Sequence, residues 1–171
     1  MEKRKKLDLS QTGEIGRLIR RIDKEWMLLT AGSKERLNTM TASWGSVGVL
    51  WHKPMLNIFV RPERYTSAFI EAEAYFSAAF FPPEYQEALT FCGRKSGREV
   101  DKVAACEFTV AEGEAGGVYF MEADLVLICK KRYRAALEPS QMIDIAPGLF
   151  YGEHGKPHVM YMGEIVEVYT K

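Results

Sequence analysis

The chain has 171 residues, of which 47% are hydrophobic and 27% are charged. These values are ordinary for one globular domain and exclude a wholly disordered chain. Lys and Arg together number 23, as do Asp and Glu, so the formal net charge is zero. A nucleic-acid binder normally carries a basic excess, because phosphate contacts supply most of its affinity. No window approaches the roughly 20 apolar residues of a membrane helix. We expect a single domain over residues 1–171, with neither a nucleic-acid nor a membrane partner.

The N-terminus and the cysteines indicate where such a protein works. Residues 1–10 are charged and lead into no apolar stretch, which argues against a secretory signal and predicts a flexible tail. Cys92, Cys106 and Cys129 are odd in number, and their spacings fit no zinc or redox pair. We therefore expect buried, unpaired thiols and a cytoplasmic location.

The first part of the chain predicts one short helix followed by strands. Apolar residues recur at helical spacing over Thr12–Ile22. Apolar and β-branched runs predict strands over Trp26–Ala31, Thr39–Leu50 and Met55–Val60. The second of these strands is unusual, because small polar residues occupy much of it.

The middle of the chain alternates between helix and strand. Apolar spacing predicts a helix over Tyr65–Ala72, and an aromatic run predicts a strand over Tyr75–Phe81. Prolines suit a first helical turn, so a further helix is expected from Pro82 through Leu89. The polar loop Cys92–Gly97 follows, and its two glycines indicate positive backbone angles or a close approach to another group.

The last third of the chain is dominated by strand signals. We expect a strand over Phe108–Ala111, a turn at Glu112–Gly117, a long strand run over Tyr119–Tyr133 and a final strand over His158–Tyr169. The long run is apolar on both faces, which predicts a central position in the sheet or cover by a partner. Many strands and few helices predict a mainly β protein with peripheral helices and a closed or sandwiched antiparallel sheet.

Several familiar motifs are absent from the sequence. It has no phosphate-binding G-x-x-x-x-G-K-[ST] loop, no G-x-G-x-x-G dinucleotide fingerprint and no G-x-S-x-G nucleophile elbow. His154 and His158 have a metal-like spacing, but the intervening Gly155-Lys156-Pro157 will not form the helix that this spacing needs. We predict no metal site.

Two segments suggest a ligand. Asn38–Gly45 combines hydroxyls, small side chains and open backbone on a strand, which suits a flat heteroaromatic ring. An edge strand with polar outer residues is the alternative. Arg61–Ser67 places two arginines and two hydroxyls at the beginning of a helix, where free N–H groups and the helix dipole favour an anion such as phosphate. The alternative is a capped helix whose surface arginines are paired in part by Glu63.

A third segment is the compact basic loop Gly93–Arg98, which is followed by Asp101 and Lys102. This loop could close over a ligand or reach a neighbouring subunit. A solvated charged loop is the alternative.

Four stretches in order carry a family resemblance: TMTASWGSVGVLWHKP (Thr39–Pro54), VRPERYTSAFI (Val60–Ile70), CGRKSGREVDK (Cys92–Lys102) and HVMYMGEIVEV (His158–Val168). A further stretch, EADLVLICKKRY (Glu122–Tyr133), fits the long central strand of the same family. Together they resemble the flavin reductase-like family of FMN-binding split barrels, and are most similar to its flavoredoxin branch. The resemblance spans about residues 25 to 170.

This resemblance implies a homodimeric, antiparallel Greek-key split barrel that binds FMN noncovalently near the subunit interface. It places the flavin ring against one strand, the FMN phosphate at the following helix, and a loop and helix near the flavin. It also implies that His158 begins the last strand near the nicotinamide side, with a structural role as the alternative. The matching residues are Met40, Thr41, Ala42, Ser43 and Trp44 for the ring, Arg61, Arg64 and Thr66 for the phosphate, and Ser96, Gly97 and Lys102 for the loop and helix.

The function that we expect is that of an FMN-dependent oxidoreductase of the NAD(P)H:flavin reductase type, with NADH or NADPH as co-substrate. The protein would place the flavin, which carries the chemistry, so no catalytic triad is required. One alternative is an electron-transfer flavoprotein that serves a redox partner protein. Another is a split barrel that binds a different ligand or none.

Overall fold

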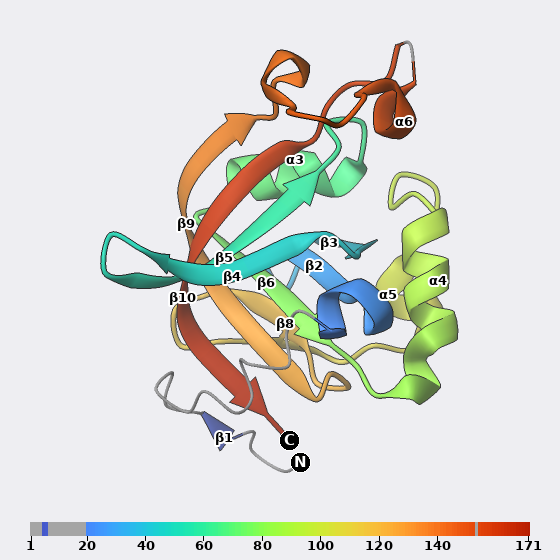
Figure 1. The fold of residues 1–171 in the computed structure, drawn as a ribbon. Helices are drawn as coiled ribbons and strands as arrows, with labels where there is room; N and C mark the ends of the chain where they lie inside the picture. Colours follow the sequence, from blue (N-terminus) through green and yellow to red (C-terminus); the bar gives the residue numbers. More distant parts are fainter. Residues whose placement is uncertain (1–4, 7–19, 153) are drawn as a thin grey trace.

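The computed structural model describes residues 5–6, 20–152 and 154–171. One antiparallel sheet dominates it, with the strand order β3-β2-β6-β9-β10-β5-β4 and β1 paired to β10 (Figure 1). A separate hairpin joins β7 and β8. The strands are β1 (Lys5–Lys6), β2 (Met27–Gly32), β3 (Leu37–Ala42), β4 (Gly45–Leu50), β5 (Lys53–Val60), β6 (Tyr75–Phe80), β7 (Val110–Glu112), β8 (Val118–Phe120), β9 (Leu125–Ala136) and β10 (Val159–Thr170). The helical segments are η1 (Arg21–Glu25), α3 (Tyr65–Ala72), η2 (Pro83–Tyr85), α4 (Gln86–Arg94), α5 (Lys102–Ala105), η3 (Pro139–Gln141) and α6 (Gly148–Tyr151).

The two edge strands of the sheet, β3 and β4, are neighbours in the chain. Only Ser43 and Trp44 separate them, and they follow one another along one side of the molecule in Figure 1. Because the strand order begins and ends on consecutive strands, the sheet has to curl until its two edges approach each other. This is the mainly β architecture that the strand pattern predicts and the split barrel that the family resemblance implies. It places the Ser43–Trp44 link at the open seam, the gap between the two edge strands.

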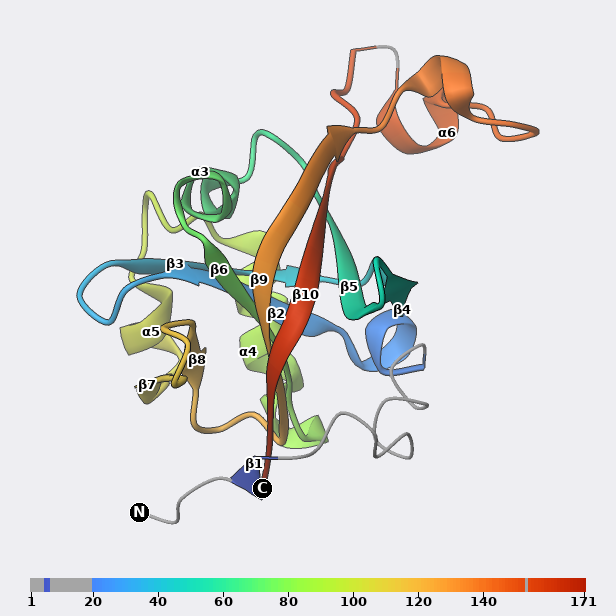
Figure 2. The ribbon, with the colours of Figure 1, turned by 90° about the vertical axis from the view of Figure 1, so that its left-hand side faces the viewer.

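Both faces of the sheet are covered. Along β9, Leu125, Leu127 and Cys129 pack into the barrel interior, whereas Val126 and Ile128 pack into a second cluster on the outside. Alternate residues of a strand point to opposite faces, so one strand supplies both clusters. β9 lies between β6 and β10, and Figure 2 shows it beside β10 through the middle of the sheet. The predicted central position of this run is confirmed.

Three predicted elements differ most from the structure. The expected strand Thr39–Leu50 is two strands, because the chain turns at the seam. The expected run Tyr119–Tyr133 is also divided, into the end of β8 and the longer β9. The loop expected at Cys92 begins later, because α4 continues to Arg94. The helix over Tyr65–Ala72 is confirmed at both ends.

Gly93 and Gly97 of the predicted loop allow it to approach β3 closely. Neither is among the residues with positive φ. A Cβ on Gly97 would overlap the side chain of Asn38, and one on Gly93 would lie 3.3 Å from Cβ of Thr41. The loop therefore packs tightly against β3.

Most of the N-terminal prediction lies outside the described residues. Of the predicted tail over residues 1–10, only Lys5–Lys6 is described, and it pairs with the end of β10. Of the predicted helix Thr12–Ile22, only the last residues are described, and they belong to the helical stretch 20–25. Within the described ranges, no helix is both long and apolar enough to cross a membrane.

Candidate functional site

A cavity of about 170 Å³ lies at the seam of the barrel. It brings together the end of β3, the Ser43–Trp44 link, the turn before α3 and the residue that precedes β10. Eight of its nine lining residues were predicted from the sequence. They are Met40, Thr41, Ala42, Ser43, Trp44, Arg61, Arg64 and His158, joined by Phe59 of β5.

A second hollow of about 210 Å³ shares Thr41, Ala42 and Ser43 with the first and continues toward α4. Its other lining residues include Trp26, Leu89 and Gly93. The two hollows lie on either side of the same strand end, and we call them together the seam cleft. A ligand held in the seam cleft would meet the backbone of β3 directly, because the side chains there are small.

The backbone of β3 has one open edge in the seam cleft. In an antiparallel pair, the N–H and C=O of a residue point to the same side, and that side alternates along the strand. Thr39 lies opposite Thr30 of β2, yet its carbonyl accepts a hydrogen bond of 2.7 Å from Nζ of Lys102. That carbonyl therefore points away from β2. Two residues on, the N–H and C=O of Thr41 point the same way and can meet the polar edge of a ring.

The last turn of α4 ties the strand to the arginines. The hydroxyl of Thr41 donates to the carbonyl of Leu89, and Nη1 of Arg64 donates to the carbonyl of Gly93 at 2.8 Å. One helical turn therefore fixes the position of the strand end relative to the guanidinium of Arg64.

The two arginines give the seam cleft an unbalanced positive charge. Nη2 of Arg61 donates to the carbonyl of Phe150 at 3.0 Å, and Arg64 is held by Gly93. Within the residues that the structure describes, neither guanidinium forms an ion pair, and Glu63 does not neutralise them. Arg64 is also the N-cap residue of α3 and makes no side-chain cap bond. Guanidinium groups beside an uncapped helix N-terminus favour an anion such as phosphate.

An aromatic wall closes the other side of the cleft. The ring of Trp44 lies 4.8 Å from that of His158 and 5.8 Å from that of Phe150. His158 is buried, and its Nδ1 lies 3.3 Å from the hydroxyl of Tyr151. Burial and the nearby Arg61 guanidinium lower the pKa of His158 below its ordinary value. The imidazole is therefore neutral at pH 7, which suits a positioning role better than proton donation.

Four predicted residues lie behind the cleft wall. The buried hydroxyl of Thr66 accepts a hydrogen bond of 2.7 Å from Asn38. Nζ of Lys102 donates to the carbonyls of Thr39 and Cys92, and Gly97 packs on Asn38. The hydroxyl of Ser96 accepts from the backbone of Arg98. These residues hold β3 and α4 in place, and their direct contact with a ligand stays a prediction.

The sequence did not single out Phe59, Phe150 and Tyr151. The last two belong to α6 (Gly148–Tyr151), which follows β9 by a long connection and packs next to the first residues of β10. The apolar run Leu149-Phe150-Tyr151 was the available signal, but nothing local in it indicates that it would return to the seam.

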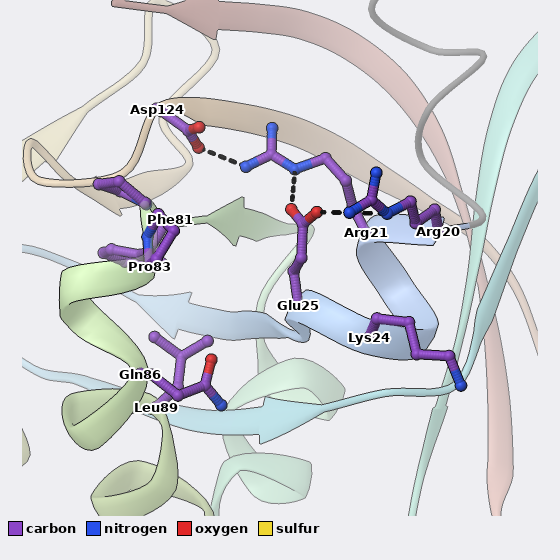
Figure 3. A pocket seen from close by; sticks show the side chains of 10 residues that line it. Arg20, Arg21, Lys24, Glu25, Phe81, Pro83, Gln86, Leu89 and Asp124 are labelled. Atoms are coloured by element: carbon purple, nitrogen blue, oxygen red, sulfur yellow. Dashed lines mark hydrogen bonds and ion pairs between the residues drawn. The ribbon is translucent and has the colours of Figure 1, made fainter.

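A larger cavity lies elsewhere (Figure 3). It has a volume of about 700 Å³ and lies between η1 and the first part of α4. Its charges are paired: Arg21 contacts Glu25 at 3.1 Å and Asp124 at 2.6 Å, while Lys24 contacts Asp23 at 2.8 Å. This cavity therefore offers no unbalanced charge to a ligand.

Among the described residues, no group of three or more His, Cys, Asp or Glu side chains could hold a metal ion. His154 and His158, which have a metal-like spacing, therefore belong to no such group.

Comparisons with known proteins identify the family. The model of the flavin reductase like domain matches residues 19–171. A flavoredoxin from Methanosarcina acetivorans is similar at 26% identity and a TM-score of 0.68, covering 86% of this chain and 68% of its own. An FMN-binding protein from Thermus thermophilus is 21% identical, with a TM-score of 0.67, over 85% and 69% of the two chains. An NADH:FAD oxidoreductase from Streptomyces globisporus is 16% identical, with a TM-score of 0.64, and the match covers 96% of this chain and 86% of the other.

No curated protein matches this chain. The chain belongs to the flavin reductase-like family, and its barrel has the fold of these proteins.

Proposed function

We propose that the seam cleft binds FMN and that the protein is an FMN-dependent oxidoreductase of the NAD(P)H:flavin reductase type. The observation that carries the proposal is the pair Arg61 and Arg64, which have no ion-pair partner among the described residues and flank an uncapped helix start beside the open edge of β3. FMN has the complementary chemistry, with an anionic phosphate at one end and a flat, hydrogen-bonding ring at the other.

The residues of the seam cleft fit FMN, because no ion pair of Arg61 or Arg64 with a described residue has to break before the phosphate binds. Arg61, Arg64 and the first N–H groups of α3 would hold the phosphate. The open backbone at Thr41 and the Ser43–Trp44 link would hold the ring edge, and N–H donors there stabilise negative charge on a reduced ring. Bound FMN would supply the hydride and electron chemistry. Neutral His158 would keep the indole of Trp44 in place and would transfer no proton.

We further propose that a second copy of the chain completes the cleft. Each hollow is smaller than the roughly 300 Å³ at which small-molecule pockets begin. Beside the cleft, Trp44 and Phe150 are each 43% exposed and Leu149 is 79% exposed. Large exposed apolar patches mark interaction surfaces, and cover by a second copy would both bury these side chains and enclose the ligand.

The dimer is tested by sedimentation of the wild type, Leu149→Asp and Val49→Asp. Val49 is 78% exposed on the far hairpin and serves as the matched apolar control. We expect a wild-type dimer that Leu149→Asp converts to monomer and Val49→Asp leaves intact. A monomeric wild type, or a dimer that tolerates Leu149→Asp, would overturn the proposal.

An electron-transfer flavoprotein is the second candidate function. Its support is the absence of any nicotinamide fingerprint in the sequence and the similarity in fold and sequence to a flavoredoxin. In that case a partner protein, not NADH or NADPH, would reduce the flavin.

An absorbance spectrum separates these functions. The protein is purified, supplied with FMN, and recorded before and after anaerobic addition of NADH or NADPH. Bands near about 370 and 450 nm establish the flavin, and rapid bleaching of the longer band supports the reductase. A bound flavin that stays oxidised supports the electron carrier. Failure to bind added FMN would overturn both functions and leave only the fold.

A further inference from the structure

Two cysteines whose spacing predicts no pairing lie in contact. Sγ of Cys92 and Sγ of Cys106 are 3.9 Å apart, although 14 positions separate them in the chain. Cys92 is fully buried in the last turn of α4, and Cys106 ends α5 and is partly exposed. Both thiols are free. Cys129 differs, because it is buried in the core of the sheet and its sulfur donates to the carbonyl of Leu127, at 4.0 Å.

We propose that Cys92 and Cys106 form a reversible disulfide when the protein meets hydrogen peroxide, and that this disulfide loosens the seam cleft. The pair is thus a redox modification site. Its effect on the cleft rests on the proposed FMN-binding function, whereas the disulfide itself does not.

The chemistry balances with hydrogen peroxide as the two-electron oxidant. The sulfur of Cys106 attacks one peroxide oxygen, the O–O bond breaks, and water leaves behind a sulfenic acid. The sulfur of Cys92 then attacks the sulfur of Cys106, the S–O bond breaks, and the departing hydroxide takes the proton of Cys92 as a second water. The two sulfurs lose two electrons in total, and peroxide gains them.

The surroundings assign the first step to Cys106. An oxidant can reach it, whereas Cys92 is closed to solvent. Burial raises the pKa of both thiols, that of Cys92 to about 12. For Cys106 this effect is opposed by a hydrogen bond from Cys92 and by the charge of Lys102. Both thiols therefore ionise less readily than an ordinary cysteine, and Cys106, the one that an oxidant can reach, reacts first, while Cys92 resolves its oxidised form.

Formation of the disulfide requires a small movement at the wall of the seam cleft. The sulfurs must approach from 3.9 Å to a bond length of about 2.05 Å. Cys106 follows a helix of only four residues, whereas Cys92 lies in one of nine, so most of the movement falls on α5.

Movement of either helix reaches the cleft. Nζ of Lys102, at the start of α5, donates to the carbonyls of Cys92 and Thr39 at 2.8 and 2.7 Å. On the side of α4, the neighbouring carbonyls of Leu89 and Gly93 accept from Thr41 and Arg64. The disulfide therefore displaces contacts that position the open strand and the arginine.

The modification is tested on the full chain with hydrogen peroxide. Free thiols are alkylated after denaturation, and intact mass and tryptic peptides are measured. Trypsin separates Cys92 from Cys106 but leaves Cys106 and Cys129 in one peptide, because the chain has no Lys or Arg between Lys102 and Lys130. Cys129→Ala therefore serves both as the control and as the variant that makes the cross-link unambiguous. Cys106→Ser is the variant that removes it.

We expect wild type and Cys129→Ala to lose two thiols, to become two hydrogens lighter, and to recover both thiols in dithiothreitol. Cys106→Ser should form no intramolecular cross-link. Oxidation of Cys106 to the sulfinic or sulfonic acid with Cys92 still reduced would overturn the proposal, as would persistence of both thiols in peroxide.

The effect on the cleft is read from FMN titrations of the reduced and oxidised forms of Cys129→Ala. We expect FMN affinity to fall at least about fivefold on oxidation, the effect of losing one ordinary hydrogen bond, and to recover on reduction. Equal FMN affinity in the two forms would overturn the proposed effect of the disulfide on the seam cleft, but not the disulfide itself. If neither form binds FMN, the proposed function fails, while the thiol measurements still decide the modification site.

Discussion

Two cavities of this protein differ in charge as well as in size. The larger one, between η1 and α4, has a volume of about 700 Å³, and its basic side chains meet carboxylates of the same chain. The smaller one, at the seam, has a volume of about 170 Å³ and two guanidinium groups that have no carboxylate partner among the described residues. A charge that the fold leaves unbalanced is available to a ligand, whereas a paired charge must first lose its partner. Electrostatics, not volume, therefore marks the candidate site.

The largest expected effect is the loss of the buried cation behind the seam. Lys102→Met keeps the apolar stem but leaves the carbonyls of Thr39 and Cys92 without their donor. We expect the free energy of unfolding to fall by about 2 kcal/mol, the cost of leaving buried polar groups unsatisfied. Urea unfolding measures it, with the exposed Lys95→Met as control. Equal stability of the two variants would show that the hydrogen bonds of Lys102 do not stabilise the fold.

Charge reversal at each cavity tests the comparison directly. Arg64→Glu should weaken FMN binding by at least about 1.5 kcal/mol, the low end for hydrogen bonds to charged groups. Arg20→Glu makes the same change of charge at the rim of the larger cavity, where the side chain is 83% exposed, and should leave FMN affinity unchanged. Isothermal titration measures both. The opposite pattern would move the ligand to the larger cavity.

A substitution inside the larger cavity should change stability alone. Arg21→Met removes the contacts of this largely buried side chain with the partly exposed carboxylates of Glu25 and Asp124. We expect a loss of about 1 kcal/mol in unfolding free energy, the upper end for an accessible ion pair, with no change in FMN affinity. Thermal unfolding and titration on the same sample measure the two quantities. A coupled loss of FMN binding would show that the cavities are not independent.

The smallest expected effect is a dependence of stability on pH at the seam. Burial and Arg61 lower the pKa of His158 in the folded protein, so the unfolded chain takes up its proton at a higher pH. The stabilisation is therefore complete above about pH 6.5 and is lost as the pH falls through the folded pKa. His158→Gln should flatten the decline of unfolding free energy below about pH 6.5, whereas the exposed His154→Gln should not. If unfolding free energy falls with pH in the same way in both variants, His158 is not the origin of the pH dependence.

Local sequence determined most of the elements and suggested the two candidate ligand-binding segments. Apolar spacing identified α3 at both ends, and the two-faced apolar run identified β9 as central, because helix and strand periodicity depend only on near neighbours. The residue types at Met40–Trp44 and Arg61–Thr66 were enough to suggest a ring and an anion. All of these signals lie within a few residues of one another.

Tertiary structure decided what depends on contacts between distant residues. Only the closed strand order shows that Thr39–Leu50 must divide at the seam. Only packing shows that Lys102 bonds two carbonyls behind the cleft, that Phe150 returns to Arg61, and that Cys92 meets Cys106. The sequence determined which chemistry is present, because residue type and local periodicity are written along the chain. The fold alone decided which of these groups meet, because each such contact depends on how the whole sheet curls.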